Sequence, residues 1–190
     1  MSSGVKNPPR ATYEDLIALP EFQVGEIVDG ELDASLRPST RHSRSATALA
    51  FRLGPAFDDG RGGPGGWWLL LEPELHFAED VVVPDLGGWH RERMPELPEE
   101  PFFSLPPDWV CEVVSPSTER LDRAKKLAVY ARAGVAHLWL VNPQSRTLEA
   151  YRNDGGRWLL VATHAAAAVA RMQPFDAMEF ELSVLWGEAT

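Results

Sequence analysis

The sequence contains one cysteine, Cys111, among 190 residues. A lone cysteine cannot form a disulfide within the chain, which is typical of a reducing cytoplasm. The apolar runs are far shorter than the roughly 20 residues that a membrane-spanning helix needs. Residues 1–10 also lack the apolar core of a signal peptide. We therefore expect a cytoplasmic protein without membrane segments, in which Cys111 is a small core residue.

Positive charge is also scarce, with 18 Lys and Arg against 28 Asp and Glu and a formal net charge of −10. Proteins that grip nucleic acid by charge alone are usually basic, so this composition disfavours nonspecific polyanion binding. It leaves room for a local basic face, or for an acidic site that a metal ion neutralises. The content of 44% hydrophobic residues is typical of a globular protein. We expect a loose tail over 1–10 and a single domain over 11–190.

Hydrophobic patterns predict a fold in which strands outnumber helices. Helices are expected over 12–21, 38–57 and from Thr118 to Ala133, with Thr12 and Thr118 as N-caps. The expected strands are a hairpin within 24–32 around Asp29-Gly30, two strands within 67–84 that turn near Glu79-Asp80, a strand at 109–115, a strand at 137–143, a hairpin within 148–164 and a last strand at 180–186. Residues 87–107 are expected as a long Pro-rich connection. A helix between the strands at 109–115 and 137–143 predicts that these two strands are parallel.

Three acids stand out by their position: Glu26 beside a hairpin turn, Asp85 after the VVVP run, and Glu112 inside the apolar run WVCEVV. By alternation Glu112 shares a strand face with Val110, so it is expected to be buried. A buried carboxylate needs a cation, a proton or several hydrogen-bond donors. A structural ion pair with Lys or Arg would satisfy Glu112, and so would a divalent ion held with a second acid. Oxygen ligands without a Cys/His cluster favour Mg²⁺ or Mn²⁺.

The predicted helix at 38–57 lies in a stretch without a single acid from Ala34 to Phe57. Its arginines Arg41, Arg44 and Arg52 fall on one arc beside the apolar face. This arc is either a solvated face or a set of phosphate contacts. His42 falls on the apolar arc. It is therefore either a core residue or a residue that lines the site.

A longer string of motifs resembles a known family. The motifs, in order, are VVVPDLGGW at 81–89, EVVSPST at 112–118, the residues Asp122, Lys126 and Tyr130 at steps of four, and GVAHLWLVNP at 134–143. This string resembles the Uma-two family of putative restriction-endonuclease-like proteins, within the PD-(D/E)XK nuclease superfamily. The resemblance runs from about Tyr13 to Trp158, and GEIVDGEL and His42 also fit it.

The resemblance implies an α/β (α+β) fold with a restriction-endonuclease-like core, a mixed β-sheet flanked by helices, and additional antiparallel hairpins. It implies a metal-dependent endonuclease that hydrolyses DNA, with Asp85 and Glu112 as ligands of Mg²⁺ or Mn²⁺ and Glu26 as a further acid. Val114 stands where the short motif has its lysine, and Lys126 on the next helix is the matching replacement, with Lys125 as the runner-up. His42, Asp122 and Tyr130 would line the site. Helical-wheel geometry places the expected core face of this helix roughly opposite Lys126, on Leu121, Ala124, Leu127, Ala128 and Ala131.

Two other functions are compatible with these residues. The first is a catalytically inactive nuclease-like scaffold that binds nucleic acid or protein, which the acidic composition favours. The second, ranked last because nothing specifies a sugar site, is a glycosidase with paired acids. Exposed apolar residues toward the C-terminus predict a homo-oligomer, most simply a dimer.

Overall fold

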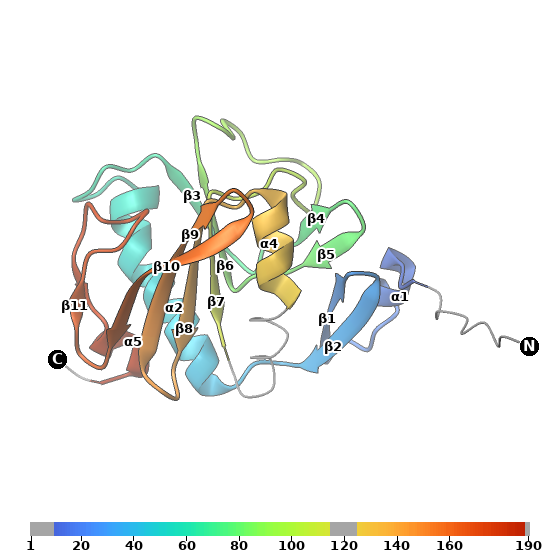
Figure 1. The fold of residues 1–190 in the computed structure, drawn as a ribbon, viewed down its shortest axis with the longest axis horizontal. Helices are drawn as coiled ribbons and strands as arrows, with labels where there is room; N and C mark the ends of the chain where they lie inside the picture. Colours follow the sequence, from blue (N-terminus) through green and yellow to red (C-terminus); the bar gives the residue numbers. More distant parts are fainter. Residues whose placement is uncertain (1–9, 115–124, 189–190) are drawn as a thin grey trace, which may run out of the picture.

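The computed structural model describes residues 10–114 and 125–188, and within these ranges its centre is a mixed six-stranded sheet (Figure 1). The strand order is β10-β9-β8-β7-β6-β3. Only the β7–β8 pair is parallel among these neighbours, as the crossover predicted. The strands are β3 (Trp67–Leu71), β6 (Leu86–His90), β7 (Trp109–Val113), β8 (His137–Asn142), β9 (Thr147–Asp154) and β10 (Arg157–Ala165).

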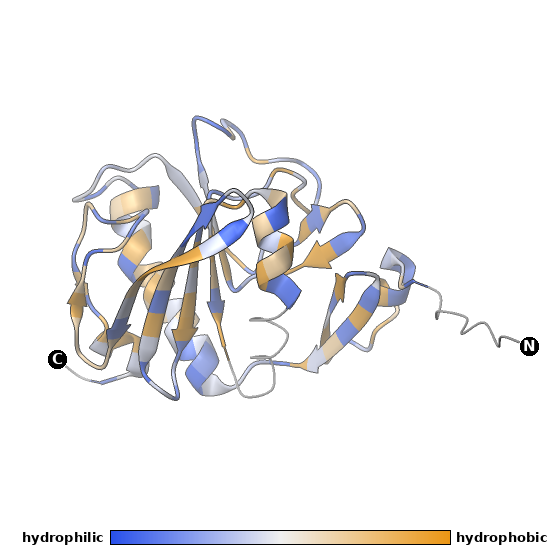
Figure 2. Ribbon diagram, viewed as in Figure 1, coloured by the Kyte–Doolittle hydropathy of each residue, from blue (hydrophilic) through white to orange (hydrophobic). Residues whose placement is uncertain are grey.

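A smaller sheet of four antiparallel strands has the order β2-β1-β5-β4. Its hairpin turns at Asp29-Gly30, where both residues have positive φ angles of 54° and 82°, as an Asp-Gly turn favours. Polar and apolar residues alternate along this hairpin (Figure 2). The strands are β1 (Gln23–Val28), β2 (Glu31–Leu36), β4 (Leu75–Phe77) and β5 (Asp80–Val82).

Two main helices lie against the large sheet (Figure 1). The helix α2 (Thr40–Leu53) begins at the N-cap Ser39 and continues into a π-helical turn, η1 (Gly54–Asp58). The helix α4 (Leu127–Ala133) ends at Gly134, whose φ of 87° is the left-handed conformation that glycine adopts easily. The short elements are α1 (Tyr13–Ile17), capped by Thr12, α5 (Ser183–Trp186), β11 (Val169–Ala170) and β12 (Phe180–Glu181).

The alternation of β7 divides the core into two clusters. Its Trp109, Cys111 and Val113 join the cluster under α2 and the C-terminal segment. Val110 and Val114 join the cluster under α4 and the smaller sheet. Glu112 therefore points toward the α4 side, between two apolar neighbours on its own face. Cys111 is fully buried, and this burial raises the pKa of its thiol well above the ordinary value, so its place as a core residue is confirmed.

The structure corrects four of the sequence predictions. Residues 67–84 form parts of three strands rather than two, and the start of the expected connection at 87–107 belongs to β6. The expected last strand at 180–186 is a two-residue strand followed by a helical turn. The predicted core face of α4 is wrong in part: Ala131 is buried as expected, but Ala128 is exposed and Leu127 half-buried, whereas Lys126, Val129 and Tyr130 are buried. Leu121 and Ala124 lie outside the described residues. Thr118 and residues 1–9 of the tail lie outside the described residues.

No helix in the described part of the chain is both long enough and apolar enough to cross a membrane.

Candidate active site

Glu112 is the fourth of the five residues of β7 and is only 3% exposed. Its partner on the adjacent strand β8 is the apolar Leu140, and the carboxylate depends on partners from the α4 side. An ionised carboxylate without such partners would be strongly destabilised in this position. The candidate site consists of the groups that bind this carboxylate and of the acids beside it.

Lys126, which directly precedes α4, supplies the cation. Its Nζ lies 2.7 Å from Glu112 Oε1 and 2.8 Å from Glu26 Oε1. Lys126 is itself only 2% exposed, so a long cationic side chain is buried between two carboxylates. Its ammonium group also donates a hydrogen bond of 3.2 Å to the Val83 carbonyl. The sequence predicted that Lys126 replaces the motif lysine, whose position Val114 occupies. The structure brings Lys126 into contact with Glu112.

Tyr130, one turn after Lys126, donates a hydrogen bond of 2.6 Å to the same Glu112 Oε1. The ring is fully buried in the cluster under α4. Burial above all, followed by the negative charge of Glu112, raises the pKa of Tyr130 well above its ordinary value. The phenol is therefore protonated at neutral pH and donates to the carboxylate.

Glu26 reaches the same point from β1 of the smaller sheet. It is 9% exposed, and its Oε1 accepts a hydrogen bond of 2.6 Å from the Val83 backbone N–H. Val83 therefore binds Glu26 through its N–H and Lys126 through its carbonyl. The backbone contribution of Val83 was not predicted, and its side chain gives no sequence signal that could have revealed it.

Asp85 lies two residues after Val83, immediately before β6. Its Oδ2 accepts a hydrogen bond of 2.7 Å from the Val113 backbone N–H, which places it beside β7 one residue from Glu112. Its Oδ1 lies 3.1 Å from His42 Nε2, on the first turn of α2. The segment from Val83 to Asp85 thus connects the Glu26–Lys126 pair with the Asp85–His42 pair. His42, a residue of ambiguous role in the sequence, contacts a candidate ligand.

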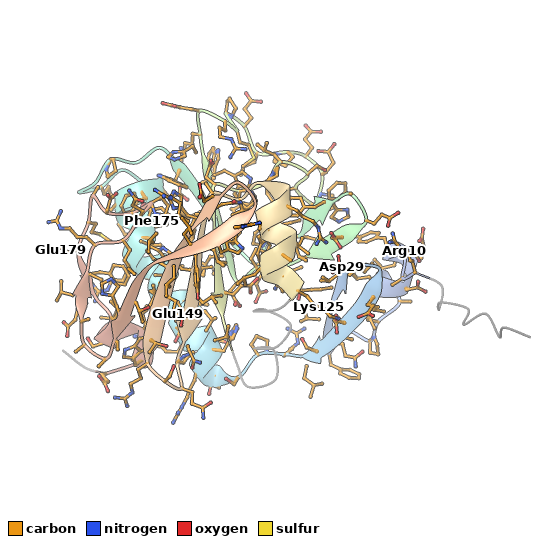
Figure 3. The ribbon with its side chains drawn as sticks, in the orientation of Figure 1. Arg10, Asp29, Lys125, Glu149, Phe175 and Glu179 are labelled. Atoms are coloured by element: carbon orange, nitrogen blue, oxygen red, sulfur yellow. The ribbon has the colours of Figure 1, made fainter. Side chains whose placement is uncertain are left out.

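The remaining predicted residues lie away from this centre. Arg41, Arg44 and Arg52 are exposed on α2, and within the described residues none forms an ion pair with an acid. Lys125, the alternative lysine, points to the β1–β2 hairpin instead, where its Nζ lies 2.7 Å from Glu31 and 3.1 Å from Asp33 (Figure 3). Asp122 lies outside the described residues.

Carboxylate oxygens are the ligands that Mg²⁺ and Mn²⁺ prefer, and Glu26 and Glu112 already share one cation, the Lys126 ammonium. In residues 10–114 and 125–188, however, no three or more Asp, Glu, His or Cys side chains are arranged to hold a metal ion together. The donor chemistry fits a divalent ion, but the arrangement is one in which a lysine is the cation between two of the acids.

The chain superposes on the crystal structure of a putative nuclease belonging to DUF820 from Anabaena variabilis with a TM-score of 0.75. The two share 20% sequence identity, and the match covers 93% of this chain and 98% of that one. At this identity the likeness concerns the fold.

The family follows from the sequence itself. Residues 11–184 match the Uma-two family, which is described as a putative restriction endonuclease, and the chain belongs to this family. The resemblance seen in the motifs and the expected mixed α/β fold are both confirmed. No curated protein matches the sequence.

Proposed function

We propose that this protein is a metal-dependent endonuclease that hydrolyses phosphodiester bonds of DNA. The observation that carries the proposal is the convergence of Glu26, Glu112 and Lys126 at β7, with Asp85 bound to the adjacent Val113 N–H. Membership of the restriction endonuclease family supports the same reaction. Asp85 and Glu112 would hold Mg²⁺ or Mn²⁺, with Glu26 as a further acid.

When bound, the ion supplies Lewis-acid activation of a phosphate oxygen and of the attacking water. The protein's own residues position the acids and supply a positive charge. Tyr130 and the Val113 N–H fix the orientations of Glu112 and Asp85, which keeps the acids in place before a substrate arrives. Lys126 brings a positive charge to the point where negative charge develops on the phosphate.

The arginines of α2 suit contacts to the DNA backbone. Arg41 and Arg44 lie on the first turns of the helix whose His42 contacts Asp85, and both are exposed. Phosphate contacts position a duplex without reading its sequence. In an acidic protein, such a local group of arginines also offsets long-range repulsion of DNA.

The decisive experiment compares two aspartates of equal exposure. Asp85 and Asp108 have side chains that are each 14% exposed, but Asp108 binds Arg93 away from the cluster. We expect calorimetry to show Mn²⁺ binding in the wild type and in Asp108→Asn, and its loss in Asp85→Asn. Nicking of supercoiled plasmid DNA should follow the same order. Equal Mn²⁺ binding in Asp85→Asn and the wild type would remove Asp85 from the metal site.

A second candidate is the inactive scaffold that binds nucleic acid. The observation that favours it is that Glu112 already has a cation, because Lys126 neutralises it without a metal. The two functions differ in one result. A scaffold would bind DNA in a mobility-shift assay in the presence of a chelator and leave the plasmid intact when Mg²⁺ or Mn²⁺ is added.

A further inference from the structure

The arrangement around Lys126 has a consequence for metal binding, and the inference drawn from it rests on the proposed function. An ammonium group has three N–H donors and no acceptor. Among residues 10–114 and 125–188, the acceptors that the Lys126 ammonium contacts include Glu26 Oε1 at 2.8 Å, Glu112 Oε1 at 2.7 Å and the Val83 carbonyl at 3.2 Å. In these contacts the lysine directs its donors at the protein.

The Lys126 ammonium also lies where a cation is required. It lies between two buried carboxylates that come from different sheets, Glu26 on β1 and Glu112 on β7. Two such charges repel each other unless a cation lies between them. The lysine supplies such a cation from within the protein.

We propose that Lys126 is a built-in counter-cation that a divalent ion must displace from Glu112. In the metal-free protein it holds Glu26 and Glu112 together. Binding of the ion at Asp85 and Glu112 transfers Glu112 from the lysine to the metal. The freed ammonium then has a donor to direct toward the substrate phosphate. Metal binding thereby controls whether Lys126 can contact the substrate phosphate. In the metal-free protein the lysine stays bound to Glu26 and Glu112.

The first test is the affinity for Mn²⁺, measured by calorimetry without DNA. Lys126→Met removes the competing cation, and we expect its dissociation constant for Mn²⁺ to fall at least about tenfold below that of the wild type, since the acids then lack a cation. Lys125→Met is the matched control, because it removes the same charge one residue away from a pair with Glu31 and Asp33. An equal gain in both variants would show a general charge effect and overturn the proposal, as would unchanged or weaker binding in Lys126→Met.

The second test uses the wild-type protein and so does not depend on the variant folding. Amine acetylation, read by mass spectrometry, compares the buried Lys126 with Lys125 in the same molecule. We expect saturating Mn²⁺ to increase acetylation of Lys126 several-fold while that of Lys125 stays constant, because the ion releases the Lys126 ammonium. Acetylation of Lys126 that is unchanged or reduced by bound Mn²⁺ would refute displacement.

These outcomes separate the two proposals. If the wild type binds no Mn²⁺, the metal-dependent function fails and the displacement of Lys126 fails with it. If the wild type binds Mn²⁺ through Asp85 but Lys126 neither competes nor becomes reactive, the metal site stands and the counter-cation role is wrong.

Discussion

The hydrogen bond from Tyr130 to Glu112 can be removed with little other change. Tyr130→Phe keeps the buried ring and deletes the hydroxyl that lies 2.6 Å from Glu112 Oε1. A hydrogen bond to a charged group contributes about 1.5–3 kcal/mol to the free energy of unfolding. For a chain of this length each kcal/mol corresponds to about 2–4 °C in Tm. We therefore expect Tyr130→Phe to lower Tm by about 3–12 °C.

The assay is differential scanning calorimetry in the presence of a chelator, with Tyr13→Phe as the control. Tyr13 also donates to a carboxylate, Glu74, at 2.9 Å, but this hydrogen bond is exposed to solvent. Its removal should change Tm by no more than about 2 °C, because water replaces the lost partner. If both variants melt together with the wild type, Glu112 does not depend on Tyr130, and the reasoning about its burial is wrong.

Three further predictions concern stability and assembly. Burial above all lowers the pKa of His137, so the unfolded chain binds a proton at this residue more readily than the folded protein does. The free energy of unfolding, measured by urea denaturation, should therefore fall as the pH drops below about 6.5. It should fall less steeply with pH in His137→Asn. Gly134→Ala places a side chain at a φ of 87° with no atom near its Cβ, so a loss of about 1–2 kcal/mol in urea denaturation would come from the backbone alone. The edge strand β10 exposes Leu159, Leu160 and Val161, and Figure 2 shows this apolar stretch. We predict that it pairs with a second copy, so light scattering should give a dimer mass for the wild type and a monomer mass for Leu160→Arg, and a monomeric wild type would contradict self-association.

The sequence predicted those parts of the fold that local patterns determine. The Asp29-Gly30 turn, the end of α4 at Gly134 and the parallel β7–β8 pair all follow from residues close together in the chain. Gly87 and Gly88 in β6 were assigned to the Pro-rich connection expected over 87–107. In the structure they let the strand lie against aromatic rings: a Cβ on Gly87 would lie 3.0 Å from the Trp89 ring, and one on Gly88 would lie 3.1 Å from Trp109.

In the candidate site, too, local sequence patterns did not reveal contacts between residues that are far apart in the chain. Glu112 was conspicuous because a carboxylate in an apolar strand needs a partner, and the family motif indicated Lys126. The helical wheel nevertheless placed the expected core face roughly opposite Lys126, because that face was chosen from the apolar residues of the helix. Lys126 is buried because Glu26 approaches it from a hairpin 100 residues earlier in the chain, and no local pattern contains that contact.

The order of the strands along the chain has a consequence for how the protein comes apart. β1 and β2 of the smaller sheet precede β3 of the large sheet, whereas β4 and β5 follow β3 and precede β6. No single cut in the backbone therefore separates the two sheets from each other with all the strands of both intact. Splitting the gene between β2 and β3 would leave β1 and β2 in one fragment and β4 and β5 in the other, so the smaller sheet and the Glu26–Lys126 contact would form only when the fragments reassemble. Restored ion pairing at this point would thus report fragment complementation, and heating the intact chain should melt both sheets in one cooperative transition.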